Sequence, residues 1–417
     1  MSLDDQETET IELDAEEVPG LSGAIQQKFI EAEQGRYNDE RRWLKAYKNY
    51  RGVSDSSTAY SSSEKSKVFI KITKVKVLAA FGQIIDILFS NNKFPITVSS
   101  SPVPEGVAEF AHIPSPEEKQ LPKEIGNTSL HDLGYDGEDM QEFLAGLKEK
   151  YNGSTLIEGK SIFDTAQISP AQEAARNLEK QIHDQLMNTN AMTVLRHSIF
   201  ECCLLGTGII KGPFNFNKTI HNWKVENDQK TYEPYEKVIP KIEAVSCWDF
   251  YPDPAAVSLN DAEYVIQRHR YNREQLRSLI HRPYFDKMAI EDVLSESPKY
   301  EGKHFESEIH SEGDEYLFSD KRYEILEYWG MLDATLARQF GLDVPHYVSD
   351  LDSVQVNAWI VGDAVIRLVL NPFVPARIPY FTFPYELNPY QLFGIGVAEN
   401  MEDSQLLMNG HMRMAID

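Results

Sequence analysis

Apolar residues recur at helical spacing in several separate segments of the chain. In residues 24–50 the apolar positions begin with Ile25 and Phe29, and the pattern predicts a helical region that ends at Gly52. A second helix is predicted over residues 64–89, with Val68, Ile72, Val75 and Ala79 on one apolar stripe. Ser169 followed by Pro170 has the order of an N-cap and first helical residue, so we expect helices over 170–188 and 191–205. Shorter helices are predicted over 272–280 and 286–294.

Strand-like patterns lie between these helical segments. Residues 214–270 are rich in Val, Ile and Tyr, and residues 322–332 alternate apolar and polar positions with period two. Residues 356–370 form a predicted hairpin with its turn at Gly362 and Asp363. The chain is therefore expected to have an α+β fold, mainly helical, with inserted antiparallel strands.

The final segment, residues 390–417, combines a glycine-flanked turn with a predicted helix. Gly394 and Gly396 precede apolar residues at helical spacing, which are Val397, Met401, Met408, Met412 and Ile416. Acidic residues near its start and Arg413 near its end suit the helix dipole. No capping residue follows, so we expect the helix to continue in a longer protein.

Changes in composition divide the chain into five predicted regions. Residues 1–22 are an acidic tail, expected to be disordered, because eight acids and no Lys or Arg occur in the first twenty residues. Residues 23–90 hold the N-terminal helices, and 91–168 form a Pro- and Ser-rich insertion with at most a short helix at 139–151. Residues 169–389 form an α+β domain that contains a loop or linker at 295–320. Residues 390–417 are the start of the last helix.

Charge and cysteine content exclude several classes of protein. The net charge of −24 is opposite to the basic surface that most proteins need to grip nucleic acid, although it allows DNA to slide past an acidic wall. The three cysteines and eleven histidines show no metal or disulfide spacing. No apolar run is long enough for a membrane span, and no secretory signal begins the chain. We expect no membrane contact, no metal and no cofactor.

Three groups of residues are candidates for a nucleotide-binding, catalytic or DNA-contacting site. GTGIIKGP (206–213) differs from a phosphate-binding loop, because Lys211 is followed by Gly and Pro on an extended segment. Asp249 and Asp253 are interpreted as turn residues between prolines, not as a catalytic pair. The lysine stripe at Lys67, Lys71 and Lys74 is interpreted as a solvated face or a subunit interface, with DNA contact as an alternative.

Five strings together resemble a known family, in that family's order. They are ERRWLKAYKNYRG (40–52), KVFIKITKVKVLAAFGQIIDILF (67–89), GTGIIKGP (206–213), WDFYPDP (248–254) and G-x-G-x-x-E-x-x-x-D-x-Q-x-x-x-N-x-x-x-R (394–413). The chain resembles the portal, or head-to-tail connector, proteins of short-tailed bacteriophages, and looks like their N-terminal, mainly wing, portion. The residues that carry the resemblance are Gly206, Gly208, Lys211, Trp248, Asp249, Asp253, Pro254, Gly394, Gly396, Glu399, Asp403, Gln405, Asn409 and Arg413.

The resemblance implies a structural protein of the virion with no catalytic or nucleotide-binding residues. It implies a ring of twelve copies at one capsid vertex, through which double-stranded DNA passes without sequence readout. The terminase large subunit, a tail adaptor and the major capsid protein would be its partners, and the final helix would lead into the stem. The insertion at 91–168 has no counterpart in the family's pattern. Alternatives are another viral ring or tail component, or a carboxylate-dependent hydrolase or nuclease.

Overall fold

A computed structural model describes the protein at residues 19–53, 66, 68–89, 94–99, 156–157, 160–161, 170–226, 229–232, 234–298, 300, 302–309, 322–349 and 351–417. Most of the predicted tail, Lys67, most of the insertion at 91–168 and its short helix at 139–151 lie outside these residues. The chain divides into two compact units, one formed by Met1–Leu88 and Thr189–Asp417 and the other by Phe89–Asn188. The five predicted regions stay a prediction.

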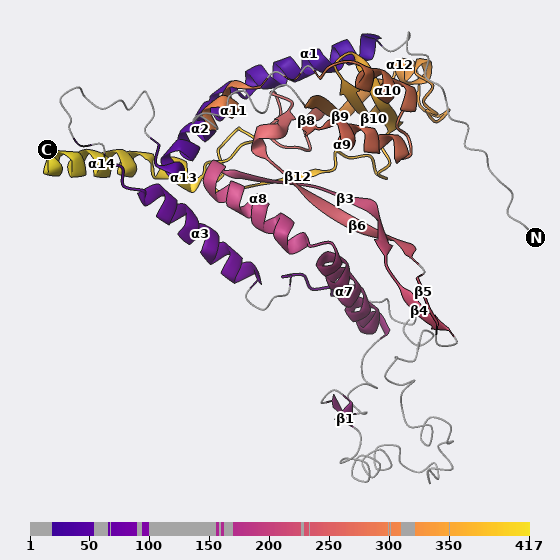
Figure 1. Cartoon of the computed structure of the whole chain (residues 1–417), viewed down its shortest axis with the longest axis horizontal. Coiled ribbons are helices and arrows are strands. Elements are labelled where there is room, and N and C mark those ends of the chain that lie inside the picture. The colour runs from indigo at the N-terminus through magenta and orange to yellow at the C-terminus, as the bar shows by residue number, and fades with distance from the viewer. Residues whose placement is uncertain are drawn as a thin grey trace, which may run out of the picture. The chain divides into compact units, whose positions relative to one another are not determined.

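The first unit is built on a five-stranded antiparallel sheet with the order β11-β10-β9-β8-β7 (Figure 1). Its strands are β7 (Phe250–Pro252), β8 (Tyr264–Tyr271), β9 (Tyr323–Asp333), β10 (Ser353–Val361) and β11 (Ala364–Leu370). The hairpin predicted at 356–370 is confirmed, with its turn after Val361. These antiparallel strands, together with the helices, confirm the expected α+β fold class.

The two faces of this sheet bury different sets of side chains, because neighbouring residues of a strand point to opposite faces. One face carries Ile266 and Tyr328 and is covered by α1 (Pro19–Gly35), whose Leu21, Ile25 and Phe29 enter the same core cluster. The opposite face packs against α9 (Arg273–Ser278), η5 (Leu279–His281) and α10 (Lys287–Ser295). That second cluster contains Leu276, Leu279, Phe285, Ile290, Leu294, Tyr323, Ile325, Trp359 and Ile366.

A second sheet, β12-β3-β6, starts directly at the end of a helix. The helix α8 (Ala191–Leu205) ends at Gly206, and β3 (Thr207–Ile220) follows, paired with β12 (Tyr380–Pro384) and β6 (Tyr235–Val245). The strands β4 (Trp223–Glu226) and β5 (Gln229–Tyr232) form a small hairpin between β3 and β6. The extended segment predicted at 206–213 and the strand predicted from residue 214 therefore form one continuous strand, β3.

The remaining helices of the first unit correct two boundaries. The helix α2 (Tyr37–Arg51) ends as predicted, with Gly52 in the left-handed conformation. The helix α3 (Ile72–Phe89) begins later than predicted, since residues 68–71 have no regular secondary structure. The predicted final helix is interrupted at Met401, giving α13 (Val397–Asn400) and α14 (Glu402–Ile416). Part of the expected linker at 295–320 is also helical, as α11 (His304–Ile309), because its side chains pack against α2 and Trp248.

The second unit contains α7 (Pro170–Asn188), which starts at the predicted proline, and the short strands β1 (Leu156–Ile157) and β2 (Lys160–Ser161). Within it, the ring centroids of Phe94 and His183 lie 6.2 Å apart, and the carboxylate of Glu179 accepts a hydrogen bond from the backbone N–H of Val98. Across both units, none of the described helices is long and apolar enough to cross a membrane.

Candidate functional site

The two glycine-containing motifs at 206–208 and 394–396 meet in space. Gly206 has φ +99°, which favours glycine, and its N–H donates to the carbonyl of Cys202. A Cβ on Gly394 would lie 2.7 Å from the carbonyl oxygen of Gly206, and a Cβ on Gly206 would overlap the backbone of Gly394. The hydroxyl of Thr207 accepts a hydrogen bond from the N–H of Gly394 at 2.9 Å. The glycines therefore allow one backbone to pass directly over the other.

Two further glycines complete this crossing. A Cβ on Gly396 would lie 2.7 Å from the carbonyl oxygen of Leu204, and one on Gly208 would overlap the ring of Phe383 on β12. The glycine turn at 394–396, which leads into α13, therefore packs directly against the backbone at the end of α8.

Lys211 is committed to a buried ion pair between the two sheets. Its Nζ lies 2.5 Å from Oε2 of Glu327 on β9, and both residues are almost completely buried. The same carboxylate accepts hydrogen bonds from the Trp329 indole at 2.8 Å and contacts His269 at 2.7 Å. Although burial alone would raise the pKa of Glu327, these partners, Lys211 foremost, hold its pKa well below the usual value. The side chain of Lys211 thus joins β3 to the five-stranded sheet.

The WDFYPDP motif lies where helices and the larger sheet come together. Trp248 stacks on Phe305 of α11 with ring centroids 4.6 Å apart and meets the edge of Trp43 on α2. Asp249 accepts a hydrogen bond from Arg270 of β8 at 2.8 Å. Each side chain of this short 3-10 turn, η4 (Cys247–Asp249), therefore reaches a different element.

Asp253 and Pro254 have local contacts. The carboxylate of Asp253 accepts hydrogen bonds from the backbone N–H of Ala255 and of Glu263, as in a turn. Pro254 packs against Gly35, where an added Cβ would lie 2.7 Å from the proline ring. Asp249 and Asp253 thus have separate sets of partners.

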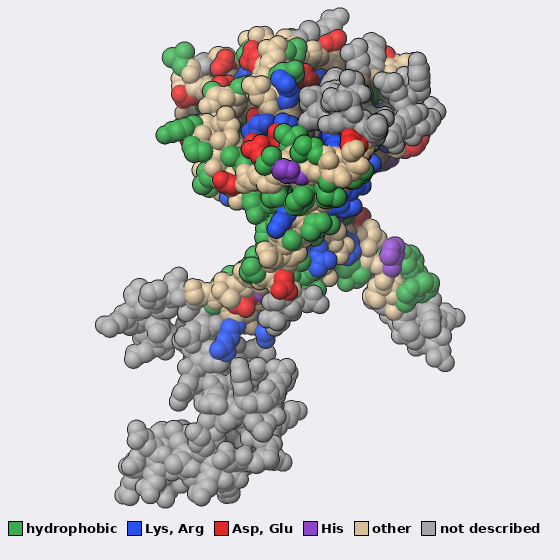
Figure 2. Space-filling view, turned by 90° about the vertical axis from the view of Figure 1, so that its left-hand side faces the viewer, with side chains coloured by type: hydrophobic (Ala, Val, Ile, Leu, Met, Phe, Trp, Pro, Cys, Tyr) green, Lys and Arg blue, Asp and Glu red, His purple; other side chains and the backbone are tan. Residues whose placement is uncertain are grey.

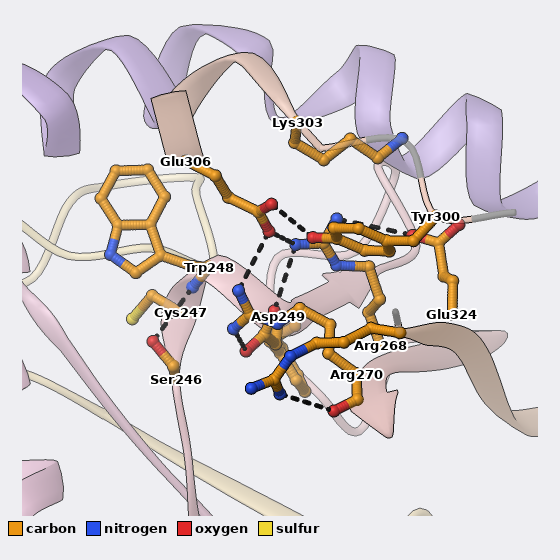
Figure 3. A network of polar contacts seen from close by, with 12 residues as sticks. Ser246, Cys247, Trp248, Asp249, Arg268, Arg270, Tyr300, Lys303, Glu306 and Glu324 are labelled. Atoms are coloured by element: carbon orange, nitrogen blue, oxygen red, sulfur yellow. Dashed lines mark hydrogen bonds and ion pairs between the residues drawn. The ribbon is translucent and has the colours of Figure 1, made fainter. Parts of the chain in front are cut away.

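A network of charges anchors α11 beside Asp249 (Figure 3). The fully buried guanidinium of Arg268 pairs with Glu306 of α11 and lies 3.5 Å from both Asp249 and Glu324. Arg270 also reaches Glu306, at 3.0 Å. Outside this cluster, ion pairs connect α11 and its preceding turn to the N-terminal helices, namely Lys48 with Glu308 and Lys303 with Glu33.

Arg36, between α1 and α2, is a second buried arginine that the sequence reading missed. It donates to the backbone carbonyls of Cys247, Trp248 and Phe250 at 2.6 to 2.9 Å, and its guanidinium lies 3.6 Å from the centre of the Tyr251 ring. Nothing in the local sequence separates it from a solvated arginine. Arg268 had a signal, because period two places it on the same face of β8 as the buried Ile266.

The C-terminal motif holds α13 and α14 against α2 and against the residues at the start of α3. Glu399 pairs with Arg42 of α2 at 3.0 Å, and Arg42 also donates to the carbonyl of Gly394. Glu402 pairs with Lys45. Asp403, by contrast, is exposed.

Three residues of α14 and the residue directly after it, spaced by four, contact the backbone of Ser66, Val68, Ile70 and Thr73. They are Gln405, Asn409, Arg413 and Asp417, called here the polar stripe. Gln405 accepts from the Thr73 N–H at 3.1 Å and Asn409 from the Ile70 N–H at 2.9 Å. Gln405 and Asn409 are buried. Backbone N–H and C=O groups before a helix and in its first turn have no partner within the helix, and the polar stripe supplies partners for them.

This arrangement changes the interpretation of the apolar spacing in the last helix. Met408 and Met412 are 41% and 39% exposed, and Ile416 is 55% exposed, so the apolar positions of α14 are not its buried face.

The lysine stripe also lies at the surface, with Lys71 and Lys74 exposed at the start of α3 and Lys67 outside the described residues. Among the described residues no three His, Cys, Asp or Glu side chains form a metal-binding group.

Comparison with known proteins identifies the family. None of the curated proteins matches the chain. A family model described as phage SU10 portal protein matches residues 160–417, which include the glycine crossing, the WDFYPDP motif and the polar stripe of α14. That match covers more than half of the chain, and it agrees with the portal-like strings found in the sequence. This chain therefore belongs to the phage SU10 portal protein family and is a bacteriophage portal protein, a structural component of the head-tail connector.

Proposed function

We propose that this portal protein forms a closed ring of twelve copies at one vertex of the viral capsid. Double-stranded DNA enters and leaves the head through the centre of the ring. The terminase large subunit docks on the ring during packaging, the tail adaptor replaces it afterwards, and the major capsid protein surrounds it. The ring is assembled in the host cytoplasm and remains in the virion. Family membership supports this proposal.

The observation that carries self-assembly is the inverted burial of α14. Its buried residues, Gln405 and Asn409, are polar, whereas Leu406, Leu407 and Met414 are 58%, 63% and 71% exposed. A surface helix of a monomer normally has the reverse pattern. Figure 2 views the chain from the side on which α14 ends in Figure 1, and hydrophobic side chains reach the surface there among charged ones. Contact with another copy would remove this apolar surface from water.

The charge of the chain supports passage of DNA without tight binding. A net charge of −24 repels phosphates, so a duplex in the channel is centred and meets few places to adhere. The role is then geometric and electrostatic, with no bond made or broken. The contacts of Lys211, Asp249 and Asp253 with protein groups support this view, because these side chains have structural partners.

Mass photometry of the intact purified protein, followed by electron micrographs of top views, tests the ring. We expect one species of about twelve copies with a central hole wider than a DNA duplex. A stable monomer or dimer at micromolar concentration would refute the proposal.

The lysine stripe provides a second test of the same function. We propose that Lys67, Lys71 and Lys74 contribute to a subunit interface, and changing all three to Glu should prevent ring closure. The matched control changes Lys237 and Lys241, which lie on β6, to Glu. Rings that form unaltered from the triple variant would exclude the stripe from the interface.

A further inference from the structure

The outward face of α14 has a regular composition. Asp403, Leu407, Gly410 and Met414 are spaced by four, three and four residues, so they lie on one side of the helix. This side is turned away from the polar stripe, since each residue lies about half a turn from Gln405 or Asn409. The four residues are called here the α14 outer stripe.

The helix α3 carries a stripe with the same spacing. Lys71, directly before the helix, and Val75, Leu78 and Gly82 within it, form the α3 outer stripe. Val75 is 64% exposed and Leu78 is 43% exposed, whereas Thr73 and Val77 are the buried residues of this part of the helix.

The two stripes are complementary in charge and size. One has a lysine and the other an aspartate at its first position, and among the described residues neither Lys71 nor Asp403 forms an ion pair. Each also has one glycine, and nothing lies within 4 Å of a Cβ added to Gly82 or Gly410. A glycine inside a helix costs about 1 kcal/mol relative to alanine, and it allows close approach of another element.

We propose that α3 of one copy packs in parallel against α14 of the neighbouring copy. In this alignment Lys71 meets Asp403, Val75 meets Leu407, Leu78 fills the space over Gly410, and Met414 fills the space over Gly82. The antiparallel alignment places Lys71 against Met414 and Asp403 against Gly82, so both charges lose their partners. The contact joins two different faces, which is the type that closes into a ring. This inference rests on the proposed ring and names its contact.

Disulfide crosslinking in the intact protein tests the alignment. The double variant Val75→Cys with Leu407→Cys is oxidised with copper phenanthroline and run on a non-reducing gel. The native cysteines, Cys202, Cys203 and Cys247, are all buried. A contact between two different faces links each copy to two neighbours, so we expect a ladder of covalent multimers that extends to the size of the ring.

The matched control is Val75→Cys with Met414→Cys. Met414 lies seven residues beyond Leu407, about 10 Å along the helix, which exceeds the reach of a disulfide. We therefore expect no ladder. Each single-cysteine variant should give no species larger than a dimer.

Mass photometry of the unoxidised variants separates the two proposals. A ring without the Val75–Leu407 ladder, or a ring whose ladder comes from the Val75–Met414 pair, would overturn the helix contact and leave the ring. A chain that forms no ring before oxidation would overturn the proposed function and the contact with it. Gly82→Leu should abolish the ring at unchanged helix content, whereas Gly82→Ala should retain it. Normal rings from Gly82→Leu would also overturn the contact.

Discussion

The side-chain carbonyl of Gln405 accepts hydrogen bonds from both the backbone N–H and the hydroxyl of Thr73, at 3.1 and 3.0 Å. Both residues are buried, and more than three hundred residues separate them in the sequence. A residue near the end of the chain therefore sets the position at which α3 begins. The residues before α3 are held in the same way, since backbone groups of Val68 and Ile70 are bound by side chains of α14.

Gln405→Leu should destabilise this contact. The Thr73 N–H and hydroxyl would be left buried without their partner, which costs about 1–3 kcal/mol. We expect that loss in the free energy of unfolding from urea titration, together with faster hydrogen exchange of the Ile70 and Thr73 amides. Ser404→Ala, at an exposed position of the same helix outside both stripes, is the control and should change stability by less than about 0.5 kcal/mol. Unchanged exchange at Thr73 in the Gln405 variant would contradict this role.

Lys211→Met should be among the most destabilising single changes. It leaves the carboxylate of Glu327 buried without its closest cation, and breaking such a pair costs about 3–5 kcal/mol. The double variant with Glu327→Gln should recover part of that loss, because the uncompensated charge is gone. Lys237→Met, at an exposed position of β6, is the control. Thermal and urea unfolding of the native protein, the single variants Lys211→Met and Glu327→Gln and the double variant measures the coupling, and purely additive losses would show that the two side chains act independently.

Gly206→Ala should disrupt the glycine crossing. The positive φ and the overlap with the backbone of Gly394 act together, so we expect a loss of more than about 2 kcal/mol. Gly410 lies inside α14 with open space around it, so Gly410→Ala should stabilise the subunit by up to about 1 kcal/mol. Circular dichroism during thermal unfolding compares the two variants. Equal melting temperatures would refute the account of Gly206.

Glu201 should make stability depend on pH. Burial raises the pKa of this carboxyl to about 7, against the opposing hydrogen bonds from Ser246 and the Cys247 N–H. Between its ordinary value of 4.5 and about 7 the native state holds the proton more strongly than the unfolded state, so its contribution to stability falls as pH rises through this window. The decrease is about 3 kcal/mol for a shift of this size.

Glu201→Gln provides the matched comparison for that effect. The difference in unfolding free energy between the native protein and this variant, measured at pH 4.5, 6 and 8, should change in the direction given above. Parallel pH profiles for the two proteins would contradict the assignment, since other groups titrate equally in both.

Local patterns determined much of this protein. Hydrophobic periodicity predicted α2, the helix start at Ser169 and Pro170 indicated α7 and α8, and turn residues predicted the hairpin of β10 and β11, because each depends on neighbours within a few residues. The order of the short strings indicated the portal family before any contact between them was known. Composition also predicted an acidic chain with no metal spacing and no membrane span.

Tertiary structure decided what those strings do. Gly206 and Gly394 are required because their backbones cross in the folded subunit. Arg36 and Arg268 can be buried because carbonyls and carboxylates from distant segments pair with them. The apolar spacing of the last helix suggested the opposite of its buried face, because the backbone of Ile70 and Thr73, at the start of α3, required polar partners from α14. A pattern along the chain specifies which side of a helix is apolar, but the partner on each side is determined by the packing of the whole subunit.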